Sequence, residues 1–267
     1  MQKLFAFLKR DLLTEVSYRF SFFFQLLSVF SSIASYYFLA RFIGNAAIPE
    51  LNAYGGDYFA FVLVGVALSD YLSTSLDAFS RTIRDSQLTG TLEPLLSTQT
   101  SLPIIILCSA VYPFVWTSFH VLLYFVLGVG IFDVHFTVGN WFAAVVLLLL
   151  AIVVFSGLGI LSASFIMLFK RGSPVAWLFG MISWLLGGVL YPVTVLPEWL
   201  QKLAALLPIT YAIEGMRAAL LRGATWHELG PNFAVLLLFA ILALPLGLVS
   251  FQYATRRALI TGTLGQY

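Results

Sequence analysis

Charged residues are scarce in this sequence, and their scarcity excludes most classes of protein at once. Only 10% of the 267 residues are Asp, Glu, Lys or Arg, whereas soluble domains carry about 25%. These 14 basic and 12 acidic side chains are too few to cover a 29.5 kDa globule. A hydrophobic content of 60% excludes disorder, and a net charge of +2 gives no support to nucleic-acid binding. The class that remains is an integral membrane protein.

Cysteine, histidine and lysine are also rare, which excludes several kinds of site. The single cysteine, Cys108, allows neither an intrachain disulfide nor a multi-cysteine metal site. The three histidines lie far apart, and without an HExxH or GxSxG motif we expect no metal and no catalytic residue. None of the four lysines follows a glycine, so the chain lacks a P-loop and its energy source must be another subunit or an ion gradient.

Long uncharged runs divide the chain into membrane spans. A bilayer core about 30 Å thick requires roughly 20 apolar residues of helix. Residues 20–40, 94–132, 134–169, 172–197 and 229–255 carry no charge, and 58–80 is apolar apart from Asp70 and Asp77. We therefore expect an all-α polytopic protein, a single transmembrane domain over 1–267. Its six transmembrane helices should lie at roughly 20–42, 58–80, 101–131, 140–168, 173–193 and 232–254.

The placement of Lys and Arg predicts the orientation of these spans. Six spans put both termini on one side, and that side receives ten of the 14 basic residues. Because basic loops remain in the cytoplasm, we expect a multi-pass plasma-membrane protein with both termini cytoplasmic. We expect no signal peptide, because Lys9, Arg10, Asp11 and Glu15 interrupt the first apolar run.

The N-terminal residues 1–18 are expected to form an interfacial amphipathic helix. Lys3, Arg10 and Ser17 share one face at helical spacing, with Leu8 and Leu12 among the apolar residues opposite. The alternative is a cytoplasmic leader that merely flanks the first span.

Two connecting segments differ from ordinary solvated loops. The cytoplasmic region 81–100 is polar but carries leucines at helix-like spacing, which suggests a short helix along the membrane with an apolar edge for a partner. Gly90 and Pro94 would bend it. The extracellular region 194–231 is apolar and predicts two half-length helices, Glu198–Leu207 and Ile209–Arg222. We interpret these as a re-entrant hairpin in the outer leaflet, buried in protein or lining a wet cavity.

A polar stripe runs along the second span. Asp70 and Asp77 are seven residues apart, so they face the same side about 10 Å from each other, too far for a shared proton. Ser73, Arg81 and Arg84 continue the stripe. Acidic side chains within a membrane are costly and usually face the bundle or an aqueous path, which favours a translocation path. The alternative is that Asp77 and the arginines simply lie among the headgroups.

Two stretches resemble type-2 ABC exporter permeases. Residues 90–98, with the sequence GTLEPLLST, resemble the coupling-helix region of that family. Residues 191–201 (YPVTVLPEWLQ) and 207–217 (LPITYAIEGMR) are similar to its C-terminal signature, with Pro197, Glu198, Pro208, Tyr211, Glu214 and Arg217. The order of elements over the whole chain also matches. One departure is Pro94, since relatives more often place a proline where Gln99 stands here.

The resemblance implies the permease subunit of an ATP-driven exporter. Such permeases pair with a second copy or a paralogue, as in a homodimer, and each half docks on a separate cytoplasmic ATPase that holds ATP and Mg. This chain would then need no cofactor and would not be an enzyme. Coupling to the ATPase would fall to the following residues: Arg84, Asp85, Gly90, Thr91, Leu92, Glu93, Leu95 and Leu96.

The resemblance also implies a substrate path at the dimer interface, lined by spans 1, 2 and 5. The path candidates are Asp70, Asp77, Phe23, Tyr37 and Tyr191. We expect an amphipathic or lipid-like substrate, such as a drug, lipid or glycolipid, together with contacts to membrane lipids. Alternatives are an ion-gradient-coupled carrier that uses Asp70 and Asp77, export of lipid-linked polysaccharide, and a non-transporting scaffold.

Overall fold

The computed structural model describes residues 19–43, 49–52, 54–88, 102–132, 134, 139–169 and 174–260, and every regular element in these ranges is helical. The α-helices are α2 (Arg19–Ile43), α3 (Pro49–Asn52), α4 (Tyr58–Leu88), α6 (Leu102–Gly130), α7 (Trp141–Phe169), α8 (Pro174–Leu186), α9 (Glu198–Ala204), α10 (Pro208–Leu221) and α11 (Trp226–Ile260). A 3-10 turn, η1 (Val193–Val195), precedes α9. The expected all-α polytopic class is confirmed.

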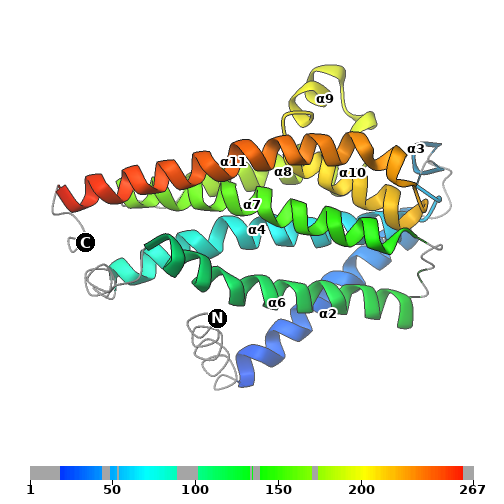
Figure 1. Cartoon of the computed structure of the whole chain (residues 1–267). Coiled ribbons are helices and arrows are strands. Elements are labelled where there is room, and N and C mark those ends of the chain that lie inside the picture. Colours follow the sequence, from blue (N-terminus) through cyan, green and yellow to red (C-terminus); the bar gives the residue numbers. More distant parts are fainter. Residues whose placement is uncertain are drawn as a thin grey trace.

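Five helices in the described residues are long and apolar enough to cross a bilayer. Their spanning stretches are Phe23–Ile43, Tyr58–Arg84, Ala110–Gly130, Trp141–Phe169 and Trp226–Ala258. They coincide with five of the six spans that the uncharged runs predict. Four of these helices, α4, α6, α7 and α11, run lengthwise through the molecule, and α2 crosses them obliquely (Figure 1).

The remaining expected span, 173–193, is not one continuous helix. The helix α8 ends at Leu186 after 13 residues, about 20 Å, which is shorter than a bilayer core. Gly188 adopts a φ of +78°, a left-handed conformation that stops the helix. The chain then passes through η1 and α9 into α10, which lies at 91° to α9. Counted as one broken span, α9 and α10 would bring the total to six.

The helix α4 occupies the centre of the molecule. Of its most apolar 18-residue window, 83% is buried, and α2, α6, α7, α8 and α10 all contact it. It continues without a break through Arg81 and Arg84 to Leu88, so residues 81–88 extend the second span. The expected connecting segment therefore begins after Leu88 rather than at 81. Residues 1–18 and 89–101, with the expected interfacial helix and residues 90–96 of the coupling motif, lie outside the described residues.

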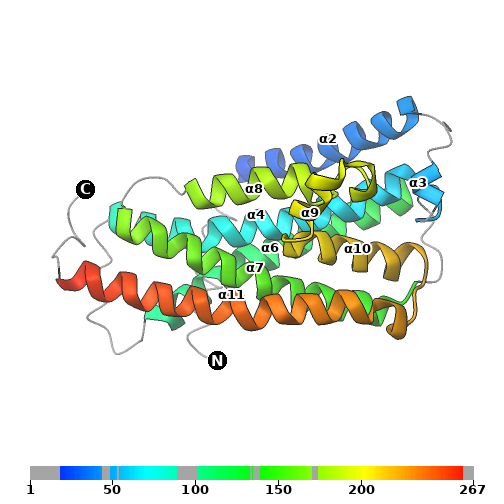
Figure 2. The same ribbon diagram turned by 90° about the horizontal axis from the view of Figure 1, so that it is seen from above.

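Small residues allow α7 to pack closely against its neighbours on two sides. Figure 2 shows α7 between α4 and α11. At Gly157, an added Cβ would lie 2.7 Å from the carbonyl carbon of Ala243 on α11. At Gly159, an added Cβ would overlap the backbone of Ser75 on α4. Ser80 and Ser162 bridge α4 and α7 with a buried hydrogen bond of 3.0 Å. Gly157, Gly159 and Ser162 therefore allow α7 to approach α4 and α11 closely.

The helix α2 lies at the periphery. Only 11% of its most apolar window is buried, and Phe20, Phe38 and Phe42 are among its exposed side chains. Its inner side is anchored by Tyr37, whose ring centroid lies 4.5 Å from that of Phe132. The outer face of α2 is therefore left to lipid or to another protein.

Candidate functional site

Asp70 lies at the middle of the membrane-spanning part of α4 and is the central residue of the candidate site. It follows Tyr58 by 12 residues, about 18 Å along the helix, and Arg84 lies 14 residues beyond it. Its Oδ2 accepts a hydrogen bond of 2.6 Å from the hydroxyl of Tyr124 on α6. Among the described residues this is the one hydrogen bond that reaches the Asp70 carboxylate.

A cavity of about 370 Å³, here called the α4–α6 cavity, opens beside Asp70. Its lining residues are Asp70, Ser73, Thr74, Asp77, Ala78, Arg81, Pro113, Trp116, Thr117 and His120. The structure thus brings Asp70, Ser73, Asp77 and Arg81 of the predicted polar stripe to one cavity, opposite an aromatic face of α6. Trp116, His120 and Tyr124 are four residues apart in turn and therefore share that face.

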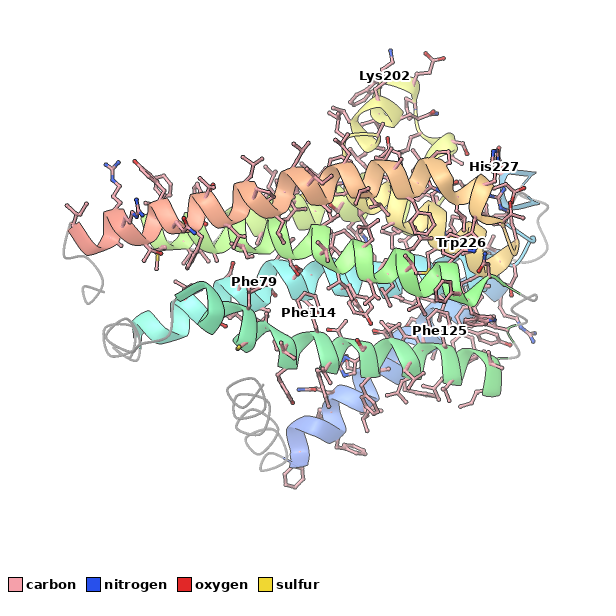
Figure 3. All side chains as sticks on the ribbon, in the orientation of Figure 1. Phe79, Phe114, Phe125, Lys202, Trp226 and His227 are labelled. Carbon is pink, nitrogen blue, oxygen red and sulfur yellow. The ribbon has the colours of Figure 1, made fainter. Side chains whose placement is uncertain are left out.

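Hydroxyl groups hold the two walls of the cavity together. The Thr74 and Thr117 hydroxyls are 2.6 Å apart, and the Tyr71 hydroxyl donates to Ser118 Oγ at 2.8 Å. Phe79 of α4 and Phe114 of α6 meet edge to face with centroids 6.5 Å apart (Figure 3). Each of these hydroxyls therefore already has one partner across the boundary between α4 and α6.

His120 contributes an unsatisfied atom to the cavity wall. Its ring lies 5.0 Å from that of Trp116. Its Nε2 is buried and has no hydrogen-bond partner among the described residues. Buried polar atoms without a partner are uncommon in folded proteins, so this atom is a place where a ligand or water would bind.

A second cavity of about 360 Å³, the α4–α8 cavity, lies on the other side of the polar stripe. It shares Ser73, Asp77 and Arg81 with the first and adds Arg84 and Trp177. Arg81 Nη2 lies 2.9 Å from Asp77 Oδ2, with side chains 74% and 50% exposed. An ion pair this exposed contributes little to stability, about 0 to 1 kcal/mol.

The other path candidates lie apart from both polar cavities. Phe23 is 60% exposed on α2 and contacts Phe24. Tyr37 packs against Phe132, and the Tyr191 hydroxyl donates to the carbonyl of Leu185. None of the three lines the α4–α6 or the α4–α8 cavity.

Arg217 is a buried cation that is satisfied entirely by backbone oxygens and an aromatic face. It is 1% exposed. Its Nε donates to the carbonyl of Phe61 at 3.0 Å, Nη1 to Gly188 at 2.7 Å and Nη2 to Val189 at 2.8 Å. The guanidinium carbon lies 3.3 Å from the ring centroid of Phe61. The end of α8 leaves carbonyls without helical partners, and the planar fork of an arginine matches two adjacent ones.

Gly65 makes room for this arrangement, here called the Arg217 cluster (Phe61, Gly65, Gly188, Val189 and Arg217). A Cβ at Gly65 would overlap the Val189 carbonyl and lie 2.6 Å from Arg217 Nη2. The cluster therefore joins α4, the end of α8 and α10 at one point.

Glu214, one turn before Arg217, is held by a different partner. Its Oε1 accepts a hydrogen bond from the hydroxyl of Tyr54, which lies between α3 and α4. Burial, followed by this hydrogen bond to Glu214, raises the pKa of Tyr54 above its ordinary value of 10.0. The pair fastens α10 to the connection that precedes α4.

The remaining residues of the C-terminal signature shape the bend between α9 and α10. Pro208 is the first residue of α10, and the Tyr211 hydroxyl donates to the carbonyl of Ala205 at 2.9 Å. The Pro197 carbonyl accepts from the amides of Leu200 and Gln201 at the start of α9, where Glu198 is exposed. These residues have local roles in capping and turning the chain.

Several residues of these sites were not identifiable from the sequence. Tyr124 and His120 lie on α6, and Tyr54, Phe61 and Gly65 precede the polar stripe. A single glycine within the apolar run of the second span was a weak signal of close backbone approach. Nothing in the sequence distinguished Tyr54, Phe61 or Tyr124 from the many other aromatic residues.

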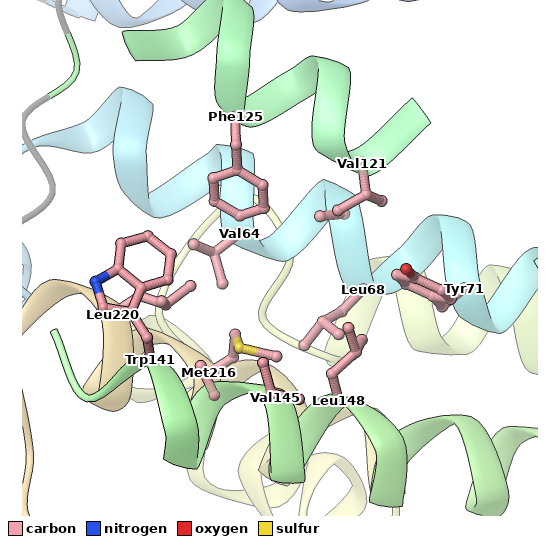
Figure 4. Close-up of a pocket in the computed structure, with 12 residues that line it drawn as sticks. Val64, Leu68, Tyr71, Val121, Phe125, Trp141, Val145, Leu148, Met216 and Leu220 are labelled. Atoms are coloured by element: carbon pink, nitrogen blue, oxygen red, sulfur yellow. The ribbon is translucent and has the colours of Figure 1, made fainter. Parts of the chain in front are cut away.

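A third, smaller cavity of about 130 Å³ lies among α4, α6, α7 and α10 (Figure 4). Its walls are apolar and aromatic side chains, among them Val64, Leu68, Phe125 and Leu148. Apolar cavities of this kind stay dry, so it offers packing space and no chemistry.

Comparison with known proteins places these features in one family. Residues 72–221 match the model of the family described as "ABC-2 type transporter". The chain is 35% identical over 116 residues to the "Inner membrane transport permease YadH" of Escherichia coli K12, and equally to those of Escherichia coli O157:H7 and Shigella flexneri. The aligned stretch is 43% of this chain and 45% of the relative, so the chain spans less than half the length of the curated relatives it matches.

Proposed function

The chain belongs to the ABC-2 type transporter family and is a multi-pass transmembrane subunit of an ABC transporter in the plasma membrane, and from this we propose how it works. We propose that a separate cytoplasmic ATPase drives export of an amphipathic or lipid-like substrate through it. Permease subunits of this family are generally non-catalytic. ATP and Mg would accordingly be bound by the partner, and this chain would hold no cofactor.

The continuity of α4 is the observation that carries the proposal. One helix of 31 residues, about 46 Å long, extends from residues next to the 89–101 segment, past both polar cavities, to Phe61 in the Arg217 cluster. Because a continuous helix is stiff, a displacement of one end also moves the other end. The helix therefore offers a direct mechanical link between an ATPase on one side and the α9–α10 bend on the other.

We place the ATPase contact at the end of α4 and in the segment that follows. Arg84 is exposed there, and Asp85, Gly90, Thr91, Leu92, Glu93, Leu95 and Leu96 would complete the surface. With the ATPase contact on the cytoplasmic side, both termini and the 81–100 region face the cytoplasm, and α9 and α10 lie on the opposite side of the membrane. The N-terminal helix of residues 1–18 would brace the cytoplasmic interface.

We further propose that a second copy of the chain, or a paralogous permease, completes the path. The outer face of α2 is exposed, and the open polar stripe of α4 lies between α6 and α8. A partner on this side would convert the half-open stripe into an enclosed path lined by α2, α4 and α8. Phe23 and Tyr191 would line it only once the partner is present, whereas Tyr37 packs on the inner side of α2 against Phe132.

The coupling assignment is tested with the double variant Glu93→Ala, Leu96→Ala. The permease is purified in nanodiscs with an ABC ATPase from the same genome, and the stimulation of ATP hydrolysis is measured. Loss of the carboxylate and of the apolar contact should abolish most of the stimulation. The matched control is Glu50→Ala with Leu242→Ala, which also removes one exposed carboxylate and one exposed leucine but lies away from the proposed contact. Unchanged stimulation in the first variant would show that the coupling assignment is wrong.

The position of Asp70 also favours a second candidate, an ion-gradient-coupled carrier. A carboxylate at the middle of a span, bonded to Tyr124, is a group that a carrier would protonate or pair with an ion. The two candidates differ in their energy source. If a proton or sodium gradient drives substrate uptake into proteoliposomes with no ATPase present, the protein is an ion-coupled carrier and the exporter proposal is wrong.

A further inference from the structure

We propose that the α4–α6 cavity binds the ammonium group of an amphiphilic amine, so that the transported substrate carries a protonated amine. The proposal rests on the proposed transport function and assigns it a substrate class. It also names residues outside the C-terminal signature as the binding site, namely Asp70, Trp116 and His120, with Tyr124 holding Asp70 in place.

The charge balance of the cavity is the first argument. Two carboxylates, Asp70 and Asp77, and one cation, Arg81, line it. Arg81 is 11 residues from Asp70, about 16 Å along α4, and is paired with Asp77 at 2.9 Å. The α6 wall, Leu102–Gly130, contains no Lys or Arg. Among the described residues no Lys or Arg pairs with Asp70, at the depth where an uncompensated charge is least stable, and a cationic ligand would compensate it.

The hydrogen-bonding capacity of the cavity points to a donor ligand. Thr74 and Thr117 bond each other, and Tyr124 already donates to Asp70. Two acceptors remain beside these bonds, the second carboxylate oxygen of Asp70 and the buried Nε2 of His120. Both accept hydrogen bonds when His120 carries its proton on Nδ1, and an ammonium group supplies several N–H donors. An anionic ligand would instead be repelled by the Asp70 carboxylate.

The wall of the cavity suits the remainder of such a ligand. The ring of Trp116 stacks on Tyr112 with centroids 6.4 Å apart and meets His120 edge to face. Indole rings attract ammonium groups through their electron-rich faces and also pack against apolar bodies. A volume of about 370 Å³ accommodates one small amphiphile, because small-molecule sites occupy about 300–1,000 Å³.

The test uses three ligands that share a pyrene body: pyrenebutylamine, pyrenebutanol and pyrenebutyrate. Binding to the permease in phosphatidylcholine nanodiscs is followed by quenching of tryptophan fluorescence, with empty nanodiscs as the reference for partitioning. We expect the amine to bind about tenfold more tightly than the alcohol, and the carboxylate most weakly, because only the amine pairs with Asp70. Trp116→Phe should remove much of the quenching, which assigns the signal to this cavity.

The decisive variant is Asp70→Asn, which should lower the affinity for the amine about tenfold and leave the affinity for the alcohol unchanged. Retained alcohol binding shows that the cavity is still folded. Asp70→Glu should keep the preference for the amine, and the exposed Glu50→Gln is the matched control that should change nothing. Equal affinities for all three ligands, or an amine preference that survives Asp70→Asn, would overturn the proposal.

Two further measurements identify the source of the amine and test the cation site and the ATPase coupling independently. If phosphatidylethanolamine in the nanodisc competes with pyrenebutylamine, the ammonium belongs to a lipid headgroup, and if it does not, a free amine is the ligand. ATPase stimulation by the permease is measured in parallel. Stimulation without amine preference refutes only the cation site, whereas amine binding without stimulation refutes only the coupling to an ATPase.

Discussion

Two regions of this molecule bury charge in opposite ways. At the Arg217 cluster, a cation is enclosed and donates to three backbone carbonyls, with a phenyl ring over its face. At the α4–α6 cavity, a carboxylate has one tyrosine donor and an open space beside it. A saturated charge holds structure together, because every group that it needs is already in place. An unsaturated charge next to a cavity is available for a ligand.

Removal of the Arg217 side chain should have the largest effect on stability. Arg217→Ala would leave three buried carbonyls without donors and a void under Phe61, for which we expect a loss of about 3–5 kcal/mol of unfolding free energy. Arg217→Lys should lose about half as much, because an ammonium keeps the charge but lacks the planar fork. Chemical unfolding in detergent micelles measures both. Arg222→Ala, at an exposed position, is the control. Equal losses of unfolding free energy in the two variants would show that the Arg217 cluster stabilises the fold no more than an exposed arginine does.

Gly65 offers a smaller test of the same cluster. In Gly65→Ala the new methyl group would press against the Val189 carbonyl and the Arg217 guanidinium, and the expected loss is about 1–3 kcal/mol. Gly230 on α11 has no atom within 4 Å of an added Cβ, so Gly230→Ala should be neutral or slightly stabilising. Thermal unfolding of the two variants, compared side by side, distinguishes close approach from helix propensity. A stabilised Gly65→Ala would contradict the tight packing described above.

The Tyr54–Glu214 hydrogen bond should add a smaller contribution that depends on pH. Tyr54→Phe removes the donor to Glu214, for which we expect a loss of about 1–2 kcal/mol at neutral pH. Because the pKa of Tyr54 is raised on folding, the unfolded chain releases this proton first, and stability should fall as pH rises above the ordinary value of 10.0. The unfolding midpoint, measured from pH 7 to 11, should decline less steeply in Tyr54→Phe. An identical decline in both proteins would assign it to other tyrosines.

The two regions also differ in how far the sequence alone predicts them. Asp70 and Asp77 stand out because charges are rare in an apolar chain, and helical spacing alone puts them on one face with Arg81. The α6 residues on the opposite side could not be predicted. Tyr124 is one of many aromatic residues in this helix, and a lone histidine such as His120 is usually a packing residue. The C-terminal signature included Arg217 and Glu214, but it could not indicate their partners Phe61 and Tyr54, which lie 156 and 160 residues earlier.

The break in the fifth span shows what periodicity cannot indicate. The uncharged run 172–197 is long enough to cross a membrane, so its length predicted a continuous helix. The turn at Gly188 is stable because Arg217, from a distant helix, satisfies the carbonyls that the turn exposes. The Gly187-Gly188 pair is a local signal for the end of α8 that the length of the run overrode, and the contact with Arg217 stabilises the turn.

The smallest effect on stability is expected at the ion pair between Asp77 and Arg81. Both side chains are at least half exposed, so Asp77→Asn and Arg81→Ala should each change the unfolding free energy by no more than about 0.5 kcal/mol, and a double-mutant cycle should give a coupling of similar size. Asp77 and Arg81 line both polar cavities, so the same substitutions should alter substrate-stimulated ATP hydrolysis far more than they alter the unfolding free energy. A coupling above about 2 kcal/mol would instead place this pair with Arg217 among the structural charges. The open stripe of α4 would then be part of the scaffold, and Asp70 alone would remain as its ligand-binding group.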